Sequence, residues 1–181
     1  MTHIRQQVML ATSAVAAASS AGHAQSALDG FYGGVSYGQF TSETDSYGSY
    51  FGTKALAGVY AGYDYNLGNL FVGGEVAYSF GSLTDDDYGT DADSFLDVKV
   101  RLGRDFDAVK VYGFVGASRY DNEYMGATES GRNYGFGASM DISPRMDMGL
   151  EYIKRDFGSP SSEYSDVRGL STVSLRLGFK F

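Results

Sequence analysis

Apolar and polar residues alternate along much of the chain with a period of two, which is the spacing of side chains on the two faces of a β-strand. In the stretch 70–81, the even positions from Leu70 to Phe80 are apolar or glycine, and the odd positions include Glu75 and Ser79. Each alternating stretch has roughly the 9 to 11 residues, or somewhat more, that a tilted strand needs to cross a bilayer. The predicted strands are 30–40, 54–65, 70–81, 95–104, 109–119, 133–141, 146–155 and 167–181.

The polar faces of these strands carry charges of both signs near mid-strand. We expect a charged interior made of Glu75, Asp97, Lys99, Arg101, Glu151 and Arg176. Counted from the strand ends, Glu75 and Arg101 reach similar depth on neighbouring strands, which predicts an ion pair between them. Glu151 and Arg176 also reach similar depth and form the second predicted ion pair. Asp97 and Lys99 are expected to extend the pair of Glu75 and Arg101 into a network. In 109–119, where aromatic residues compete with valines for the apolar side, we expect the valines to face outward.

The connections alternate in length. The short ones are "NLGN", "DFDA" and "ISPR", and the long ones are 41–53, 82–94, 120–132 and 156–166. An up-and-down outer-membrane barrel has short periplasmic turns and longer external loops. An even number of strands then leaves both termini in the periplasm.

Alternation alone does not decide which face meets lipid, because a soluble lipocalin-like barrel has the same pattern turned inside out. Here the polar face combines charges with glycine and serine, whereas the other face has Leu, Val and Phe with aromatic residues near strand ends. This favours an all-β fold, an eight-stranded antiparallel up-and-down transmembrane β-barrel. A soluble periplasmic ligand-binding barrel is the alternative fold.

The first residues are typical of a secretory signal peptide. Arg5 precedes a short apolar run, and small residues follow before Gln25. We predict a signal peptide over 1–24 with cleavage after Ala24, the nearest rival site being Ala21, and a barrel domain over 25–181.

Without residues 1–24 the chain has no Cys, Trp or His, since His3 and His23 both lie in the predicted signal. A disulfide-stapled scaffold is therefore excluded. The segment "GVSYG" matches the G-x-S-x-G nucleophile elbow, but Ser36 sits inside an alternating strand, and no histidine remains as a base. We predict no catalysis and no cofactor.

An acidic stretch, "DDDYGTDAD", is a weak candidate for Ca²⁺ because it gathers oxygen ligands near a glycine. It lacks the spacing and the final Glu of an EF-hand, so a solvated loop tip is the favoured interpretation. The candidate ligands are Asp85, Asp86, Asp87, Asp91 and Asp93.

Charge is divided unevenly between the long connections and the rest of the chain. The acids of the long connections are Glu43, Asp45, Asp85, Asp86, Asp87, Asp91, Asp93, Asp121, Glu123, Glu129, Asp156, Glu163 and Asp166, against the single base Arg132. Such loops disfavour nucleic acid, repel lipopolysaccharide phosphates unless divalent cations bridge them, and attract basic partners. Either Arg119 and Lys154 reach lipid phosphates or they are plain solvated charges at the barrel rim.

The final residues, "VSLRLGFKF", place Val173, Leu175, Leu177, Phe179 and Phe181 on one face. This ending resembles the assembly signal of bacterial outer-membrane barrels, and the chain after residue 24 resembles the small eight-stranded family that includes the outer-membrane protein A barrel and the opacity-like "porin family" proteins. The resemblance implies an outer-membrane location, contact with outer-membrane lipids and lipopolysaccharide, and recognition by the barrel-assembly machinery. It implies little about activity.

The family's enzymes, which include lipid A deacylases, palmitoyl transferases, phospholipases and omptin proteases, use histidine in the mechanisms that the resemblance implies. We therefore expect a non-enzymatic barrel with a side-chain-filled interior and acidic loops. Its expected role is in envelope structure or in adhesion to a cell-surface partner. A narrow, cation-preferring pore is the alternative function.

Overall fold

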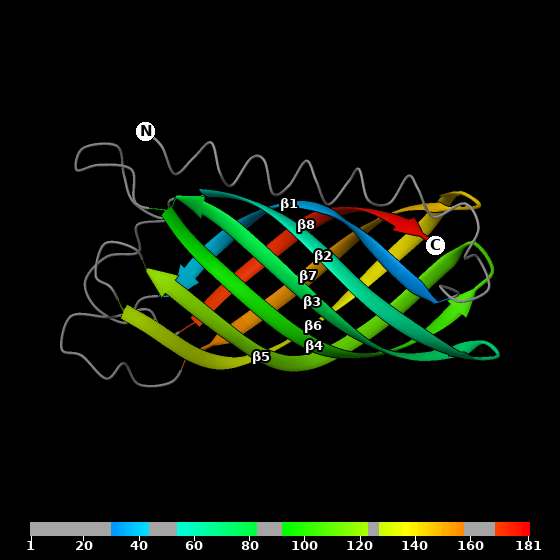
Figure 1. Ribbon diagram of the computed structural model, residues 1–181, viewed down its shortest axis with the longest axis horizontal. Helices are drawn as coiled ribbons and strands as arrows, with labels where there is room; N and C mark the ends of the chain where they lie inside the picture. Colours follow the sequence, from blue (N-terminus) through cyan, green and yellow to red (C-terminus); the bar gives the residue numbers. More distant parts are fainter. Residues whose placement is uncertain (1–29, 44–53, 83–91, 123–126, 158–168) are drawn as a thin grey trace. The chain divides into compact units, whose positions relative to one another are not determined.

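The computed structural model describes residues 30–43, 54–82, 92–122, 127–157 and 169–181. Within residues 30–180, eight antiparallel strands form one closed barrel in the order of the sequence. Figure 1 shows the strands running obliquely around the barrel. Among the described residues, no helix combines the length and the apolar character needed to cross a membrane.

Each strand spans 11 to 17 residues. The strands are β1 (Phe31–Glu43), β2 (Lys54–Leu67), β3 (Leu70–Ser82), β4 (Ala92–Phe106), β5 (Val109–Asn122), β6 (Ala127–Ser143), β7 (Met146–Asp156) and β8 (Gly169–Lys180).

The barrel closes by pairing its first and last strands. β1 pairs with β8 from Tyr32↔Lys180 to Glu43↔Gly169, and every other strand pairs with its neighbours in sequence. The closed sheet leaves no free edge to recruit another chain. The predicted up-and-down topology with eight strands is confirmed.

Three tight turns join strands at one end of the barrel, which we call the turn end; the opposite end is the loop end. Gly68 follows β2 with a φ of 76°, a left-handed conformation that glycine adopts without strain. Asp107 occupies the same region with a φ of 59°, which Asp tolerates better than most residues. In the third turn Pro144 follows β6 directly, and a β-bulge lies just before it, between Asp141 and Ser143.

The two faces of the sheet follow the predicted parity. On β5, Val111 and Val115 are 46% and 63% exposed, whereas Tyr112 and Phe114 are 5% exposed inside the barrel. The outward side chains are mostly Leu, Val, Tyr and Phe, which suits a lipid-facing surface. The prediction that the valines face outward is confirmed.

The strands extend further toward the loop end than the alternation predicted. The connection expected at 120–132 is mostly strand, because β5 runs to Asn122 and β6 starts at Ala127. The ladder continues there through polar residues such as Thr128 and Ser130, which carry no apolar alternation to reveal it.

The acidic character assigned to the long connections is thus partly a property of the strands. Glu43, Asp93, Asp121, Glu129 and Asp156 lie in strands, as does Arg132. The segments between the strands at the loop end contain Asp45, Asp85, Asp86, Asp87, Asp91, Glu123, Glu163, Asp166 and Arg168.

Candidate functional site

The lumen of the barrel is organised along β4, whose odd-numbered residues point inward. From the loop end toward the turn end these are Phe95, Asp97, Lys99 and Arg101, and each is at least nine-tenths buried. Every second residue of a strand faces the same side, so β4 contributes one side chain to each successive level of the lumen.

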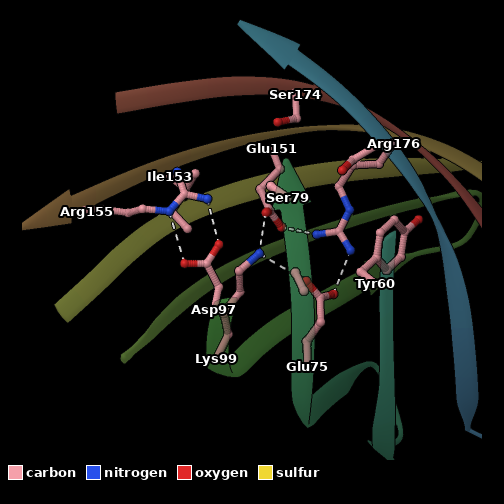
Figure 2. A pocket seen from close by; sticks show the side chains of 12 residues that line it. Tyr60, Glu75, Ser79, Asp97, Lys99, Glu151, Ile153, Arg155, Ser174 and Arg176 are labelled. Carbon is pink, nitrogen blue, oxygen red and sulfur yellow. Dashed lines mark hydrogen bonds and ion pairs between the residues drawn. The ribbon is translucent and has the colours of Figure 1, made fainter. Parts of the chain in front are cut away.

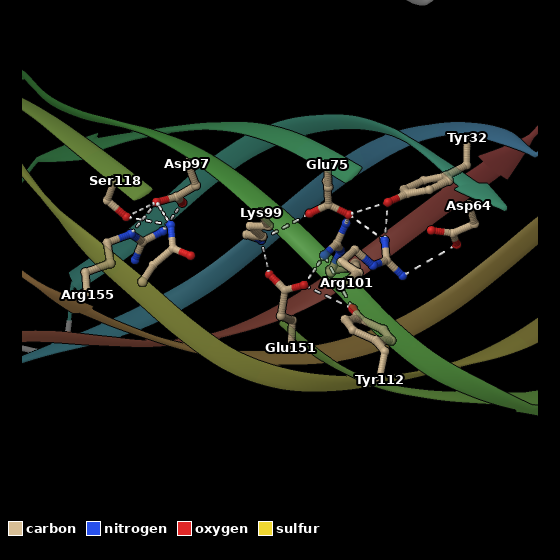
Figure 3. A network of polar contacts seen from close by, with 12 residues as sticks. Tyr32, Asp64, Glu75, Asp97, Lys99, Arg101, Tyr112, Ser118, Glu151 and Arg155 are labelled. Atoms are coloured by element: carbon tan, nitrogen blue, oxygen red, sulfur yellow. Dashed lines mark hydrogen bonds and ion pairs between the residues drawn. The ribbon is translucent and has the colours of Figure 1, made fainter. Parts of the chain in front are cut away.

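Glu75 of β3 is the centre of the main charged network (Figure 3). Its Oε1 atom lies 3.1 Å from Lys99 Nζ, and its Oε2 atom lies 2.7 Å from both Arg101 Nη1 and Arg176 Nη2. Glu75 is only 2% exposed. One buried carboxylate therefore receives three cations, from two different sides of the barrel.

Glu151 of β7 is the second carboxylate of this network. It accepts a hydrogen bond of 2.5 Å from Lys99 and another from Arg176. The predicted pairs Glu75 with Arg101 and Glu151 with Arg176 are in contact, and Lys99 and Arg176 join them into one network.

Tyrosines complete the hydrogen bonding of the two carboxylates. Tyr32 donates to Glu75 Oε2 at 3.0 Å, and Tyr112 donates to Glu151 Oε2 at 3.0 Å. Burying charges is costly unless their lone pairs and protons are satisfied, so these hydroxyls are part of what makes the network tolerable.

A second network surrounds Asp97, on the loop side of the first. Arg155 of β7 holds both carboxylate oxygens, with Nε–Oδ1 at 3.0 Å and Nη2–Oδ2 at 2.6 Å. Ser118 donates to Oδ1 at 2.5 Å, and Arg155 also donates to Thr172. Asp97 does not extend the Glu75 pair as expected, because its ion-pair partner is Arg155.

Arg155 was not among the predicted interior residues. The parity of β7, which turns Glu151 and Ile153 inward, also turns Arg155 inward, so its face was readable from the sequence. Which carboxylate it meets was not, because that partner lies 58 positions away on β4.

Aromatic rings lie against the buried cations. Arg176 lies 3.6 Å from the ring centroid of Tyr60, Arg101 lies 4.1 Å from that of Tyr112, and Arg155 lies 4.9 Å from that of Phe95. A cation over an aromatic face recovers part of the interaction lost with water.

Two apolar clusters flank the charges. The cluster at the loop end consists of Leu56, Phe95, Tyr120, Phe157 and Leu170. Phe95 and Tyr120 stack with their centroids 5.0 Å apart. The other cluster consists of Phe71, Tyr112, Phe114 and Ile153.

A small cavity of about 20 Å³ lies at mid-lumen (Figure 2). Its lining consists of Ser36, Ser79, Ser174, Ala77, Tyr60 and Ile153 together with charged side chains of both networks. A volume of this size accommodates roughly one water molecule.

The other candidate sites predicted from the sequence are not supported as catalytic or metal sites. Ser36 lies within β1 and lines the cavity, with no strand-to-helix turn around it. Among the described residues no group of three or more Asp, Glu, His or Cys side chains is placed to hold a metal ion. Of the candidate calcium ligands, Asp93 belongs to β4, and the other four fall outside the described residues. The predicted signal cleavage site at Ala24 also falls outside them.

Four of the five residues of the predicted assembly signal lie on β8, and the fifth, Phe181, directly follows the strand. Val173, Leu175 and Leu177 face outward and are 53%, 50% and 41% exposed, and Phe179 is half-buried. This is the lipid-facing side of the strand that closes the barrel against β1.

The family model of the outer membrane protein β-barrel domain matches residues 8–181. The chain belongs to this family. Its barrel therefore lies in the bacterial outer membrane, which excludes the soluble periplasmic alternative. The three tight turns then face the periplasm and the loop end faces outward, as in other barrels of this kind.

Solved structures show the same fold at low sequence identity. The neisserial surface protein NspA is 16% identical with a TM-score of 0.63, covering 84% of this chain and 98% of its own. The attachment invasion locus protein Ail of Yersinia pestis is 17% identical with a TM-score of 0.58, covering 84% and 99%. The outer membrane enzyme PagL is 11% identical with a TM-score of 0.50, covering 82% and 99%. No curated protein matches the chain.

Proposed function

We propose that this protein is a non-catalytic surface barrel, which strengthens the envelope and presents acidic loops to a basic partner outside the cell. The observation that carries the proposal is the lumen, whose described interior is occupied by two ion-pair networks and two apolar clusters. A barrel filled in this way offers its outer surface and its loops for function.

The filled lumen argues against the narrow, cation-preferring pore. An ion path needs continuous polar space, whereas the charged middle here is followed toward the loop end by the cluster of Leu56, Phe95 and Phe157. The three cations of the central network, Lys99, Arg101 and Arg176, face three carboxylates, Glu75, Glu151 and Asp64. The network therefore carries no excess negative charge that would favour the passage of cations.

The chemistry of the interior supports a non-catalytic role. The chain has only two histidines, both at or before position 23. The buried charged side chains of the central network bond to each other, which leaves them poorly placed to attack a substrate. The likeness to PagL is one of fold at 11% identity and carries no catalytic residue to this chain.

The loop sequences support an interaction role. The segments between strands at the loop end carry many more acids than bases, Asp85, Asp86 and Asp87 being consecutive. Such a surface attracts positively charged partners and repels anionic ones. Ail, a barrel of the same fold, is named as an attachment invasion locus protein, which is consistent with this proposal.

Planar-bilayer recording tests the filled lumen. We expect no stable conductance from the purified, folded protein, because the apolar and charged levels block the path. Reproducible conductance on the scale of general porins would contradict the proposal and favour a pore.

Binding by whole cells tests the loops. Cells that carry the protein should bind an immobilised basic polypeptide, and Asp85→Asn, Asp86→Asn, Asp87→Asn in combination should weaken that binding. Asp107→Asn, which removes an acid at the turn end, is the matched control and should bind normally. Equal binding by the wild type and the loop variant would exclude these loops as the contact surface.

We also propose that the outward face of β8, together with Phe181, is recognised by the barrel-assembly machinery. Phe181→Asp should reduce the amount of heat-modifiable, folded protein in outer-membrane fractions more than Asp107→Asn does. Similar amounts of the two variants would count against this role.

A further inference from the structure

Three basic side chains gather on the outer face of the barrel near the loop end. Arg119 of β5, Arg132 of β6 and Lys154 of β7 all point away from the lumen, since the inward positions of these strands belong to residues such as Ser118, Asn133 and Arg155. We call these three residues the basic triad.

The register makes the triad a continuous patch. Arg119 pairs with Ser130, two positions from Arg132 on β6, and Arg132 pairs with Asp156, two positions from Lys154 on β7. Diagonal neighbours of this kind lie about 7–8 Å apart and are within reach of long side chains. Three adjacent strands therefore bring the three bases to one place.

The position of the triad corresponds to the membrane interface. Tyr134 pairs with Lys154, and Phe136 and Tyr152 follow toward mid-membrane with ring centroids 5.5 Å apart. Aromatic girdles mark the boundary between the hydrocarbon and the headgroups in outer-membrane barrels. The bases lie on the headgroup side of this girdle.

The triad is confined to one side of the barrel. Among the described side chains, the outward residues toward the loop end of the other strands include Gln39, Ala55, Phe80, Leu96 and Ser171, and none of them is charged. A general need for solubility at the rim does not explain charges limited to β5, β6 and β7.

Among the described side chains, two exposed carboxylates form ion pairs with the arginines of the triad. Arg119 Nε lies 3.2 Å from Asp121, and Arg132 Nε lies 3.6 Å from Asp156. Both pairs are exposed, with side-chain exposures of 56% for Arg119 and 80% for Arg132, and exposed pairs of this kind are weak. Each acid lies nearer the loops than the base on its own strand, so the side facing the membrane is basic.

We propose that the basic triad binds a phosphate group of lipid A, the lipid anchor of lipopolysaccharide in the outer leaflet. Guanidinium groups bind phosphate through two parallel hydrogen bonds, and the exposed pairs of Arg119 and Arg132 with carboxylates are weak enough to exchange partners. The acyl chains of the lipid then lie along the apolar strip below, which includes Val115, Phe136 and Leu150. This site is separate from the loop function proposed above.

The test is a binding titration of folded protein in detergent micelles with fluorescent, bisphosphorylated lipid A, in the presence of EDTA. The triple variant R119Q/R132Q/K154Q should bind about tenfold more weakly than the wild type, the equivalent of one strong charged contact. R104Q is the matched control. Arg104 is an exposed, outward-facing base near the turn end of β4, and its loss should leave the affinity for lipid A unchanged. Unheated gels verify that all variants are folded, and R119Q alone provides a milder second variant with an intermediate affinity.

Fully dephosphorylated lipid A and inorganic phosphate separate the possible sources of binding. We expect the dephosphorylated lipid to bind the wild type as weakly as the intact lipid binds the triple variant, and inorganic phosphate to compete poorly because it lacks acyl chains. The proposal is overturned if the triple variant binds like the wild type, if R104Q loses as much affinity, or if dephosphorylated lipid A binds equally well. Wild-type binding that appears only when Mg²⁺ replaces EDTA also overturns it, since the acids would then bind through a bridging cation.

Discussion

The lumen contains two regions that differ in their side chains. Toward the loop end, Leu56, Phe95 and Phe157 pack against one another in an apolar cluster. In the middle, Glu75 and Glu151 share their oxygens among buried cations. Both regions exclude bulk water, but they do so with opposite kinds of side chain.

The two regions should therefore tolerate different amino-acid substitutions. An apolar cluster depends on volume, so a substitution of similar size is accepted at small cost. A charged network depends on balance, and removing one partner leaves an unpaired buried charge. A change in side-chain volume should destabilise the apolar cluster most, and a change in charge should destabilise the charged network most.

Glu75→Gln should have the largest effect, because it removes the carboxylate that three cations share while barely changing volume. We expect the free energy of unfolding to fall by about 3–5 kcal/mol. Urea titration of the protein folded in lipid vesicles, followed by gel mobility, measures this. The control Asp121→Asn removes an exposed carboxylate and should change stability by less than about 0.5 kcal/mol. A similar small change for Glu75→Gln would break the comparison.

Leu56→Ala should come next, with a loss of about 3 kcal/mol, because Leu56 is 3% exposed and its truncation leaves a cavity. Leu56→Met retains most of the volume and should cost less than about 1.5 kcal/mol. The same urea titration compares the two. Equal losses would mean that volume does not govern the apolar region.

A double-mutant cycle of Asp97→Asn and Arg155→Gln sharpens the comparison within the charged levels. The bidentate contact between these residues predicts an interaction energy of about 1–3 kcal/mol. Asp97→Asn combined with Arg104→Gln, two residues on opposite faces of β4, should be additive within about 0.5 kcal/mol. No coupling between Asp97 and Arg155 would show that their hydrogen bonds add nothing beyond packing.

Arg119→Gln should have the smallest effect on stability, below about 1 kcal/mol, because its ion pair with Asp121 is exposed. This change should shrink further in high salt, since solvent ions screen exposed charges. A loss that equals that of Glu75→Gln, in the same urea assay, would mean that burial does not set the value of an ion pair in this barrel.

The sequence predicts which face of the sheet a side chain occupies better than it predicts which residue that side chain contacts. Parity alone places Glu75, Asp97, Lys99 and Arg101 inside, since side chains alternate strictly along a strand. It also identifies the eight strands, because each carries an apolar face long enough for the membrane.

Contacts between side chains across the lumen depend on the geometry of the whole barrel, which the alternation along one strand does not contain. Arg176 reaches Glu75 from 101 positions away, through the interior of the closed barrel. Arg155 meets Asp97 rather than its near neighbour on β7, Glu151. Such meetings depend on the strand stagger and on barrel closure, which fix the relative height of inward residues on strands that do not pair. The loop-end boundaries of β5 and β6 could not be predicted either, because residues 121–122 and 127–130 are mostly polar and show no apolar alternation.

The column of inward residues on β4 has a consequence for how the barrel assembles. A shift of β4 by one position would exchange its faces and turn Asp97, Lys99 and Arg101 toward lipid. Each basic residue near the bilayer midplane then costs roughly 2–4 kcal/mol, while Leu96, Val98 and Val100 would enter a lumen lined with charge. A hairpin in which β4 is misaligned is thus destabilised even without the pairing of β8 with β1. The alternation of charged and apolar residues on β4 therefore specifies the register of this strand with β3 and β5.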